Sequence, residues 1–303
     1  MPVSLRAFSA AVVAIVLTAA PGAAQQSDDR FISEEGASER MDKAGRLRML
    51  SQRIAAAKCY AHADIAADAA DAARAQLGEA SEEYDRIIDA LTNGDDALGI
   101  HGAEDNVRIL ARMERLQEVW NPMRDAIAAA PVSDDVETVV FVYEQSIPLL
   151  EAAQLVVSEV VGDYSDPTAV MQADALRIDI AGRQRMLAQR VSKATCMALS
   201  DLDREMAVAE LESARSLYTA SANALRNGMP QAGVQPTEDA AILSALDAIL
   251  DEWASMQGVF DAALAGQAVS DADAEGLFHA MNDLTRRMDE VVGMFSANAK
   301  QNL

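Results

Sequence analysis

The chain has 303 residues and a formal net charge of −23, and half of its residues are hydrophobic although only 4% are aromatic. This length suffices for one large or two ordinary domains, and the negative charge disfavours nucleic acid and anionic membrane surfaces as partners. Alanine dominates while Gly (15) and Pro (8) are scarce, which favours a nearly all-helical fold.

The first residues have the composition of a secretory signal. Arg6 supplies a positive start, an apolar stretch follows it, and small residues precede a cleavage site at Ala24. The stretch is short for a membrane span, so an uncleaved anchor is the less favoured alternative. We expect residues 1–24 to be a signal peptide cleaved near Ala24, and the mature protein to be exported to a periplasm without inserting into the membrane.

Eight helices are expected in the rest of the chain, four in each half. In the first half they are predicted over 32–66, 68–92, 103–130 and 134–163. In the second half they are predicted over 168–201, 203–227, 237–264 and 271–299. An Asn-Gly pair follows the second helix of each half, as is typical of a helix end. Long helices with short connections pack as up-and-down bundles.

The two halves are copies of one another. Residues 44–53 read AGRLRMLSQR and residues 181–190 read AGRQRMLAQR, and the same offset relates Cys59 to Cys196. These are the only cysteines of the chain, and its only two tryptophans also match between the halves. Such self-similarity is the signature of a structural repeat.

The repeat defines the predicted domains and fold class. We expect one helical bundle over 25–165 and a second over 166–303. The predicted fold is therefore all-α, with two tandem four-helix bundles that form a pseudo-two-fold pair within one chain.

On a helix, the repeated motif places its glycine, an arginine and its glutamine on one face, because residues three and four apart are neighbours. The stripe of the first copy consists of Gly45, Arg48, Gln52, Ala55 and Cys59. The stripe of the second copy consists of Gly182, Arg185, Gln189, Ser192 and Cys196. An adjoining stripe carries Arg46 and Arg53 in the first copy, and Arg183 and Arg190 in the second. A mid-helix glycine lowers stability by about 1 kcal/mol relative to alanine, so we expect the glycines to serve close packing of another backbone.

Two related bundles that pack through equivalent faces bring equivalent residues together near their axis. Arg48 is then expected to meet Arg185, and Cys59 to meet Cys196. A small oxyanion between the two arginines relieves their repulsion, because planar guanidinium groups match its oxygens. A cysteine pair in an exported protein is expected to be oxidised, with two buried thiols as the alternative.

Other interpretations of these residues stay open. An arginine-rich helix face is often solvated or paired with acidic residues, of which this chain has 48. Residues 59–62 (CYAH) suggest a metal site, but Leu199 stands where His62 aligns, so we expect no metal. The chain has three histidines, none of them repeated, and neither a nucleophile motif nor a phosphate-binding loop. We therefore expect no catalytic residues and no cofactor.

The motif AGRQRMLAQR resembles the signature of the PilJ-type domain, the N-terminal sensory part of type IV pilus methyl-accepting chemotaxis transducers. It is also similar to the sensory segment of the nitrate/nitrite sensor kinases NarX and NarQ. In those kinases the matching helix is a nitrate-binding box within a four-helix periplasmic bundle that works as a homodimer. The resemblance implies a nitrate-contacting arginine at Arg48 and Arg185, and a further arginine of the box at Arg53 and Arg190.

The chain departs from these families in two respects. The kinases have a small residue at the positions of Arg46 and Arg183, which implies a more basic pocket and a different ligand. Family sensors also carry transmembrane helices and a signalling module, which we do not expect in this chain.

Two hypotheses follow from the residues and the resemblance together. The first is a periplasmic sensor that holds a small oxyanion, nitrate or nitrite first, between Arg48 and Arg185 and signals through a membrane receptor or transducer. The second is a ligand-free interaction module that docks to a transducer, pilus or respiratory component, with its arginines paired to carboxylates. A homodimer of the tandem chain is compatible with both.

Overall fold

The structure is a computed structural model that describes residues 34–62, 67–130, 135–165 and 172–301. The signal peptide predicted for residues 1–24 and the predicted junction between the domains at residue 166 lie outside these ranges. Within them the regular structure is helical, with no strand and only two isolated bridges. The predicted all-α class with tandem helical bundles is confirmed.

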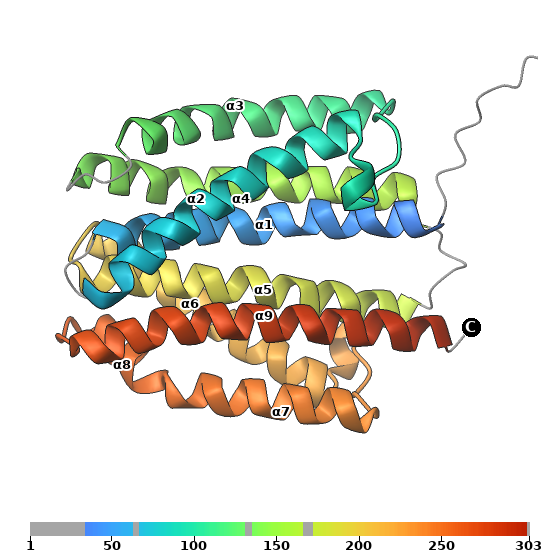
Figure 1. Ribbon diagram of the computed structural model, residues 1–303. Coiled ribbons are helices and arrows are strands. Elements are labelled where there is room, and N and C mark those ends of the chain that lie inside the picture. The colour runs from blue at the N-terminus through green and yellow to red at the C-terminus, as the bar shows by residue number, and fades with distance from the viewer. Residues whose placement is uncertain (1–33, 63–66, 131–134, 166–171, 302–303) are drawn as a thin grey trace, which may run out of the picture. The chain divides into compact units, whose positions relative to one another are not determined.

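The helices follow the duplication seen in the sequence (Figure 1). The first copy forms α1 (Glu34–His62), α2 (Ala67–Asn93), α3 (Val107–Ala129) and α4 (Val136–Tyr164). The second copy forms α5 (Gln172–Leu199), α6 (Arg204–Asn227), α7 (Ala240–Ser255), α8 (Gln257–Ala265) and α9 (Asp271–Gln301). The helix predicted over 237–264 is interrupted at Met256, where the amide donates to the carbonyl of Trp253 and closes a tighter turn.

The two motif helices, α1 and α5, lie side by side at the centre, with α4 and α2 packed on α1 and α9 and α6 packed on α5 (Figure 1). They run parallel and in register. Cys59 and Cys196 form a disulfide with their Cα atoms 6.2 Å apart. The predicted meeting of the cysteines is confirmed. From Ala181 to Ala198 most of the α5 side chains are buried, as expected for a helix surrounded by others rather than lying at the surface.

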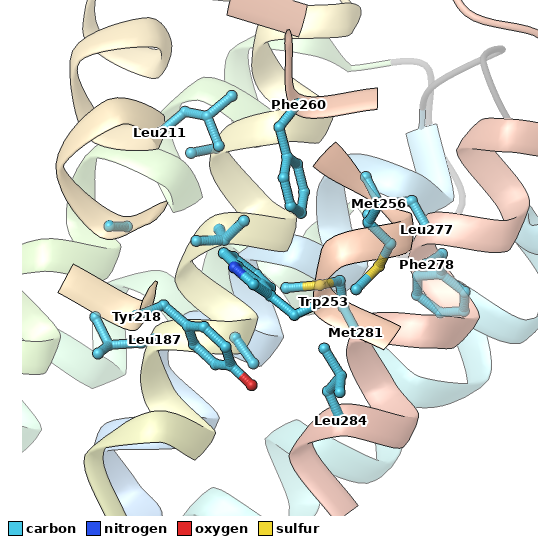
Figure 2. Packing of buried hydrophobic residues seen from close by; sticks show 14 of the residues in the cluster. Leu187, Leu211, Tyr218, Trp253, Met256, Phe260, Leu277, Phe278, Met281 and Leu284 are labelled. Carbon is cyan, nitrogen blue, oxygen red and sulfur yellow. The ribbon is translucent and has the colours of Figure 1, made fainter. Parts of the chain in front are cut away.

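Each bundle is centred on its tryptophan. The indole of Trp120 packs on Tyr84 with ring centroids 4.6 Å apart, and that of Trp253 packs on Tyr218 at 4.1 Å. Figure 2 shows Trp253 and Tyr218 among the leucine, methionine and phenylalanine side chains of the second core. Tyr60 of α1 belongs to that same cluster, so the apolar packing continues from one bundle into the other.

The second helix of each copy ends at a glycine whose conformation only glycine adopts easily. Gly94 has φ +87° and Gly228 has φ +78°, in the region that side chains disfavour. A Cβ at Gly94 would lie 2.8 Å from the carbonyl oxygen of Gly102, and one at Gly228 would lie 2.8 Å from the nitrogen of Pro236. The helix ends predicted from the two Asn-Gly pairs are confirmed.

Candidate functional site

The two central arginines of the motif converge where α1 meets α5. Arg48 and Arg185 are only 5% and 4% exposed. A Cβ on Gly45 would lie 3.8 Å from a terminal nitrogen of each arginine, and a Cβ on Gly182 would lie 3.7 Å from Arg185 and 4.0 Å from Arg48. The expectation that these glycines admit another backbone is therefore wrong, because the space beside them is filled by the two guanidinium groups.

Replacement of these glycines is expected to stabilise the protein. Gly45→Ala and Gly182→Ala place a methyl group at ordinary contact distance from the guanidinium groups, and each should raise the free energy of unfolding by about 1 kcal/mol through helix propensity. Urea denaturation measures the gain. Gly78→Ala in α2 is the matched control, because a Cβ there meets nothing within 4 Å. Loss of stability in the two motif variants alone would contradict the prediction and show that the methyl groups disturb the buried arginines.

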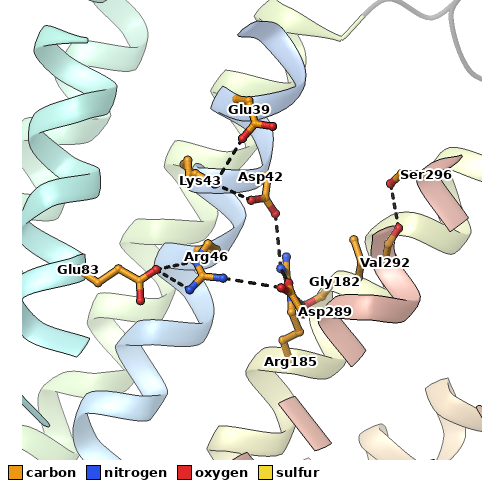
Figure 3. Close-up of polar contacts among 10 residues, drawn as sticks. All are labelled: Glu39, Asp42, Lys43, Arg46, Glu83, Gly182, Arg185, Asp289, Val292 and Ser296. Carbon is orange, nitrogen blue, oxygen red and sulfur yellow. Dashed lines mark hydrogen bonds and ion pairs between the residues drawn. The ribbon is translucent and has the colours of Figure 1, made fainter. Parts of the chain in front are cut away.

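The charge of Arg185 is closely matched by carboxylates. Its Nη1 atom hydrogen-bonds to Asp289 of α9 and lies 3.5 Å from Asp42 of α1 (Figure 3). Nearby, Arg46 donates from Nε to Glu83 at 2.7 Å and lies 3.9 Å from Asp289. Three carboxylates thus surround two arginines in this half of the site.

The charge of Arg48 is matched less well. Its Nη1 atom donates to the neutral amide oxygen of Gln154 at 2.9 Å, and Asp179 is 3.7 Å away. The same carboxylate pairs with Arg183 at 2.9 Å. Within the described part of the chain, the buried Nε of Arg48 has no hydrogen-bond partner. Burial lowers the pKa of Arg48, an effect opposed by Asp179 and reinforced by Arg183 and Arg185.

Three other predicted site residues are engaged away from this centre. Gln52 donates to the backbone carbonyl of Ser146 at 2.8 Å and so ties α1 to α4. In the second copy, Gln189 donates to Thr285 at 2.8 Å and ties α5 to α9. Arg190 donates to Glu210 at 2.8 Å. Arg53 is different, because the charges that act on it include those of Arg46, Glu83 and Asp289. Burial lowers its pKa, Arg46 reinforces this effect, and its buried Nε has no hydrogen-bond partner among the described residues. The structure thus brings together the two motif glycines and the four arginines Arg46, Arg48, Arg183 and Arg185. The two glutamines instead tie neighbouring helices to each other.

Arg40 and Arg177, which precede the two copies of the motif, donate to carbonyl groups of loops. Arg40 is 1% exposed and donates to the carbonyl of Gly102 at 2.7 Å, while it also pairs with Glu104 at 3.3 Å. Its counterpart Arg177 donates to the carbonyl of Pro236 at 3.3 Å. These two arginines therefore join the motif helices to loops of their own repeats.

A lysine that sequence reasoning did not select lies at the centre of the polar contacts between the bundles. Lys193 is fully buried, and its Nζ donates to Gln52 at 2.8 Å and to Ser146 at 2.7 Å, and lies 2.8 Å from Glu210. A comparison of the two copies could have drawn attention to Lys193, because the equivalent residue of the first copy is the uncharged Ala56. Asp42 and Asp179 were equally detectable as a pair at the repeat offset.

Burial lowers the pKa of Lys193 to about 8, from an ordinary value of 10.5. Between these values the unfolded chain binds more protons here than the folded protein does, so this residue makes stability rise with pH. Above pH 10 the buried tyrosines act in the opposite sense, since burial raises the pKa of Tyr60 and Tyr218. Chemical denaturation between pH 8 and 10 should show the rise in the wild type and a smaller one in Lys193→Met. Identical slopes would contradict the prediction.

Comparison with known proteins identifies the family. The fold and the site define a protein of two helical bundles with a pair of buried arginines where the bundles meet. The family model described as type IV pili methyl-accepting chemotaxis transducer N-term, PilJ, matches residues 32–144 and again residues 168–277. The chain belongs to this family, of which it contains two copies.

The family match implies a sensing role rather than catalysis. N-terminal domains of this family are periplasmic sensors of chemotaxis transducers and act through a signalling partner. No curated protein matches the sequence. In the described ranges, none of the helices has the length and apolar character needed to span a membrane, and no cluster of three or more metal-ligating side chains is present.

Proposed function

We propose that the protein is an exported, periplasmic sensor that binds a small oxyanion, nitrate or nitrite first, between Arg48 and Arg185 and signals through a membrane receptor or transducer. One observation carries the proposal. Arg48 and Arg185 are 5% and 4% exposed, and terminal nitrogens of both lie beside Gly45 and Gly182, where the two repeats meet. Buried like charges that approach each other are unfavourable unless anionic groups compensate them.

Arg48 is the residue through which an anion gains most. Its Nε has no partner among the described residues, and it shares the carboxylate of Asp179 with Arg183. A planar oxyanion accepts parallel hydrogen bonds from a guanidinium group and adds charge where compensation is weakest. Anion binding favours one packing arrangement of α1 and α5 over the arrangement of the ligand-free protein. A partner that binds these two arrangements unequally detects the anion.

Isothermal titration calorimetry of the mature protein tests the proposal. Nitrate or nitrite is expected to bind, and Arg48→Ala/Arg185→Ala is expected to abolish binding. Arg115→Ala, which removes an exposed arginine of α3, is the matched control and should bind as the wild type does. Absence of binding by the wild type, or equal binding by the double variant, contradicts the proposal.

A second candidate function is supported by the surroundings of Arg185. This arginine already contacts Asp289 and Asp42, so a ligand-free interaction module that docks to a transducer, pilus or respiratory component accounts for its half of the site. In that case no small anion changes the melting temperature, and the protein binds its partner with the arginines still paired. A rise in melting temperature with nitrate, but not with an equal ionic strength of chloride, argues against it.

A further inference from the structure

A groove of about 600 Å³ adjoins Arg48, between α4, α5 and α6. Its size lies within the range of small-molecule sites. The apolar side chains that line it are Leu150, Leu155, Ile180, Met186, Leu187 and Leu217. Leu155 and Leu217 are 47% and 51% exposed. The groove is thus open to solvent at Leu155 and Leu217, and Arg48 and Arg183 are among its lining residues.

Comparison of the two repeats shows that the surroundings of Arg48, where the groove lies, differ from those of Arg185. Gln52 and Gln189 donate to the carbonyls of Ser146 and Met281, which fixes how α4 and α9 correspond. Eight residues further on in each helix stand Gln154 and Asp289. Gln154 accepts from Arg48, and Asp289 accepts from Arg185. The same structural position thus holds a neutral amide in one half and a carboxylate in the other.

A second pair of equivalent positions differs in the same direction. Tyr84 and Tyr218 correspond, since each packs on the tryptophan of its own bundle. The residues directly before them are Glu83, which pairs with Arg46, and Leu217, which lines the groove beside Arg183. At both positions the Arg185 side has a carboxylate and the Arg48 side has none. Asp289 corresponds to the amide Gln154, and Glu83 corresponds to the apolar Leu217.

We propose that the groove binds a monocarboxylate with a short apolar chain, its carboxylate on Arg48 and its chain against Leu155 and Leu217. The inference rests on the proposed anion site and assigns the ligand to one half of it. The carboxylate supplies the charge that Asp289 supplies to Arg185. Glu151 also lines the groove, and with the protein's net charge of −23 it disfavours ligands that carry a second negative charge.

Calorimetry with acetate, butyrate, hexanoate and nitrate tests this assignment on the wild-type protein. Affinity should rise from acetate to hexanoate, because a longer chain buries more of the apolar lining. Carboxylate binding without any dependence on chain length contradicts the use of the groove. If nitrate binds and no carboxylate does, the anion site stands and the groove assignment falls. If neither binds, both fall.

Two variants copy the second half of the site into the first. Gln154→Asp and Leu217→Glu are each expected to weaken hexanoate binding by about tenfold or more. The aspartate takes the place of the ligand's carboxylate on Arg48, and the glutamate puts a negative charge into the apolar lining that contacts the ligand's chain. Both should remain folded by circular dichroism, because Asp289 and Glu83 are accommodated at the equivalent positions. Asn121→Asp adds the same charge on the exposed face of α3 and should bind as the wild type does. Wild-type affinity in Gln154→Asp overturns the proposal.

Discussion

Removal of the disulfide by Cys59→Ala/Cys196→Ala is expected to lower the free energy of unfolding by about 2–5 kcal/mol. The two cysteines are 137 residues apart in sequence, so the bond closes a long loop and restricts the unfolded chain strongly. The bond also joins α1 to α5, the two helices through which the repeats pack together. Urea denaturation with and without reductant measures the effect.

The double variant contains its own control. Reductant should shift the unfolding midpoint of the wild type toward that of the variant and should leave the variant unchanged. Equal urea midpoints for the wild type and the variant under oxidising conditions would contradict the prediction. Packing between the two bundles, and not the disulfide, would then account for their association.

Substitution of Lys193 by alanine is expected to have an effect of similar size, a loss of about 3–5 kcal/mol at pH 7. The change removes one of the two cations beside Glu210, the other being Arg190, and leaves the oxygens of Gln52 and Ser146 without their buried donor. Unpaired buried polar groups carry their full desolvation penalty. Urea denaturation measures the loss, with Arg115→Ala as a surface control in which only a salt bridge exposed to water is broken.

A combined variant separates the charge pair from simple packing. Lys193→Met/Glu210→Gln removes both charges and keeps most of the volume, so it should recover part of the stability that Lys193→Ala loses. No recovery would indicate that the hydrogen bonds to Gln52 and Ser146 matter more than the charge pair.

The sequence predicts the helices and the pairing of the repeats because both depend on local or repeated signals. Helix spacing places Gly45, Arg48 and Cys59 on one face, and duplication then requires that equivalent faces meet. Such reasoning is sufficient to predict the disulfide and the convergence of Arg48 with Arg185. The ends of α2 and α6 follow from an equally local signal, the Asn-Gly pair at each of them.

The partners of the arginines could not be predicted in the same way. Asp289 and Gln154 come from α9 and α4, more than a hundred residues from the arginines that they contact, and spacing within one helix says nothing about the register between helices. The difference between the two halves emerges only when those contacts identify Gln154 and Asp289 as equivalent. The role expected of the glycines was wrong for the same reason, since the atoms beside them belong to folded-back guanidinium groups.

The most direct test of the account is a crystal structure of the mature protein grown with nitrate. The account predicts planar density between Arg48 and Arg185, within hydrogen-bonding distance of terminal nitrogens from both, with Asp179 left to Arg183 alone. Crystals in which that space holds no anion at saturating nitrate, and in which Arg48 keeps Gln154 and Asp179 as its neighbours, would contradict it.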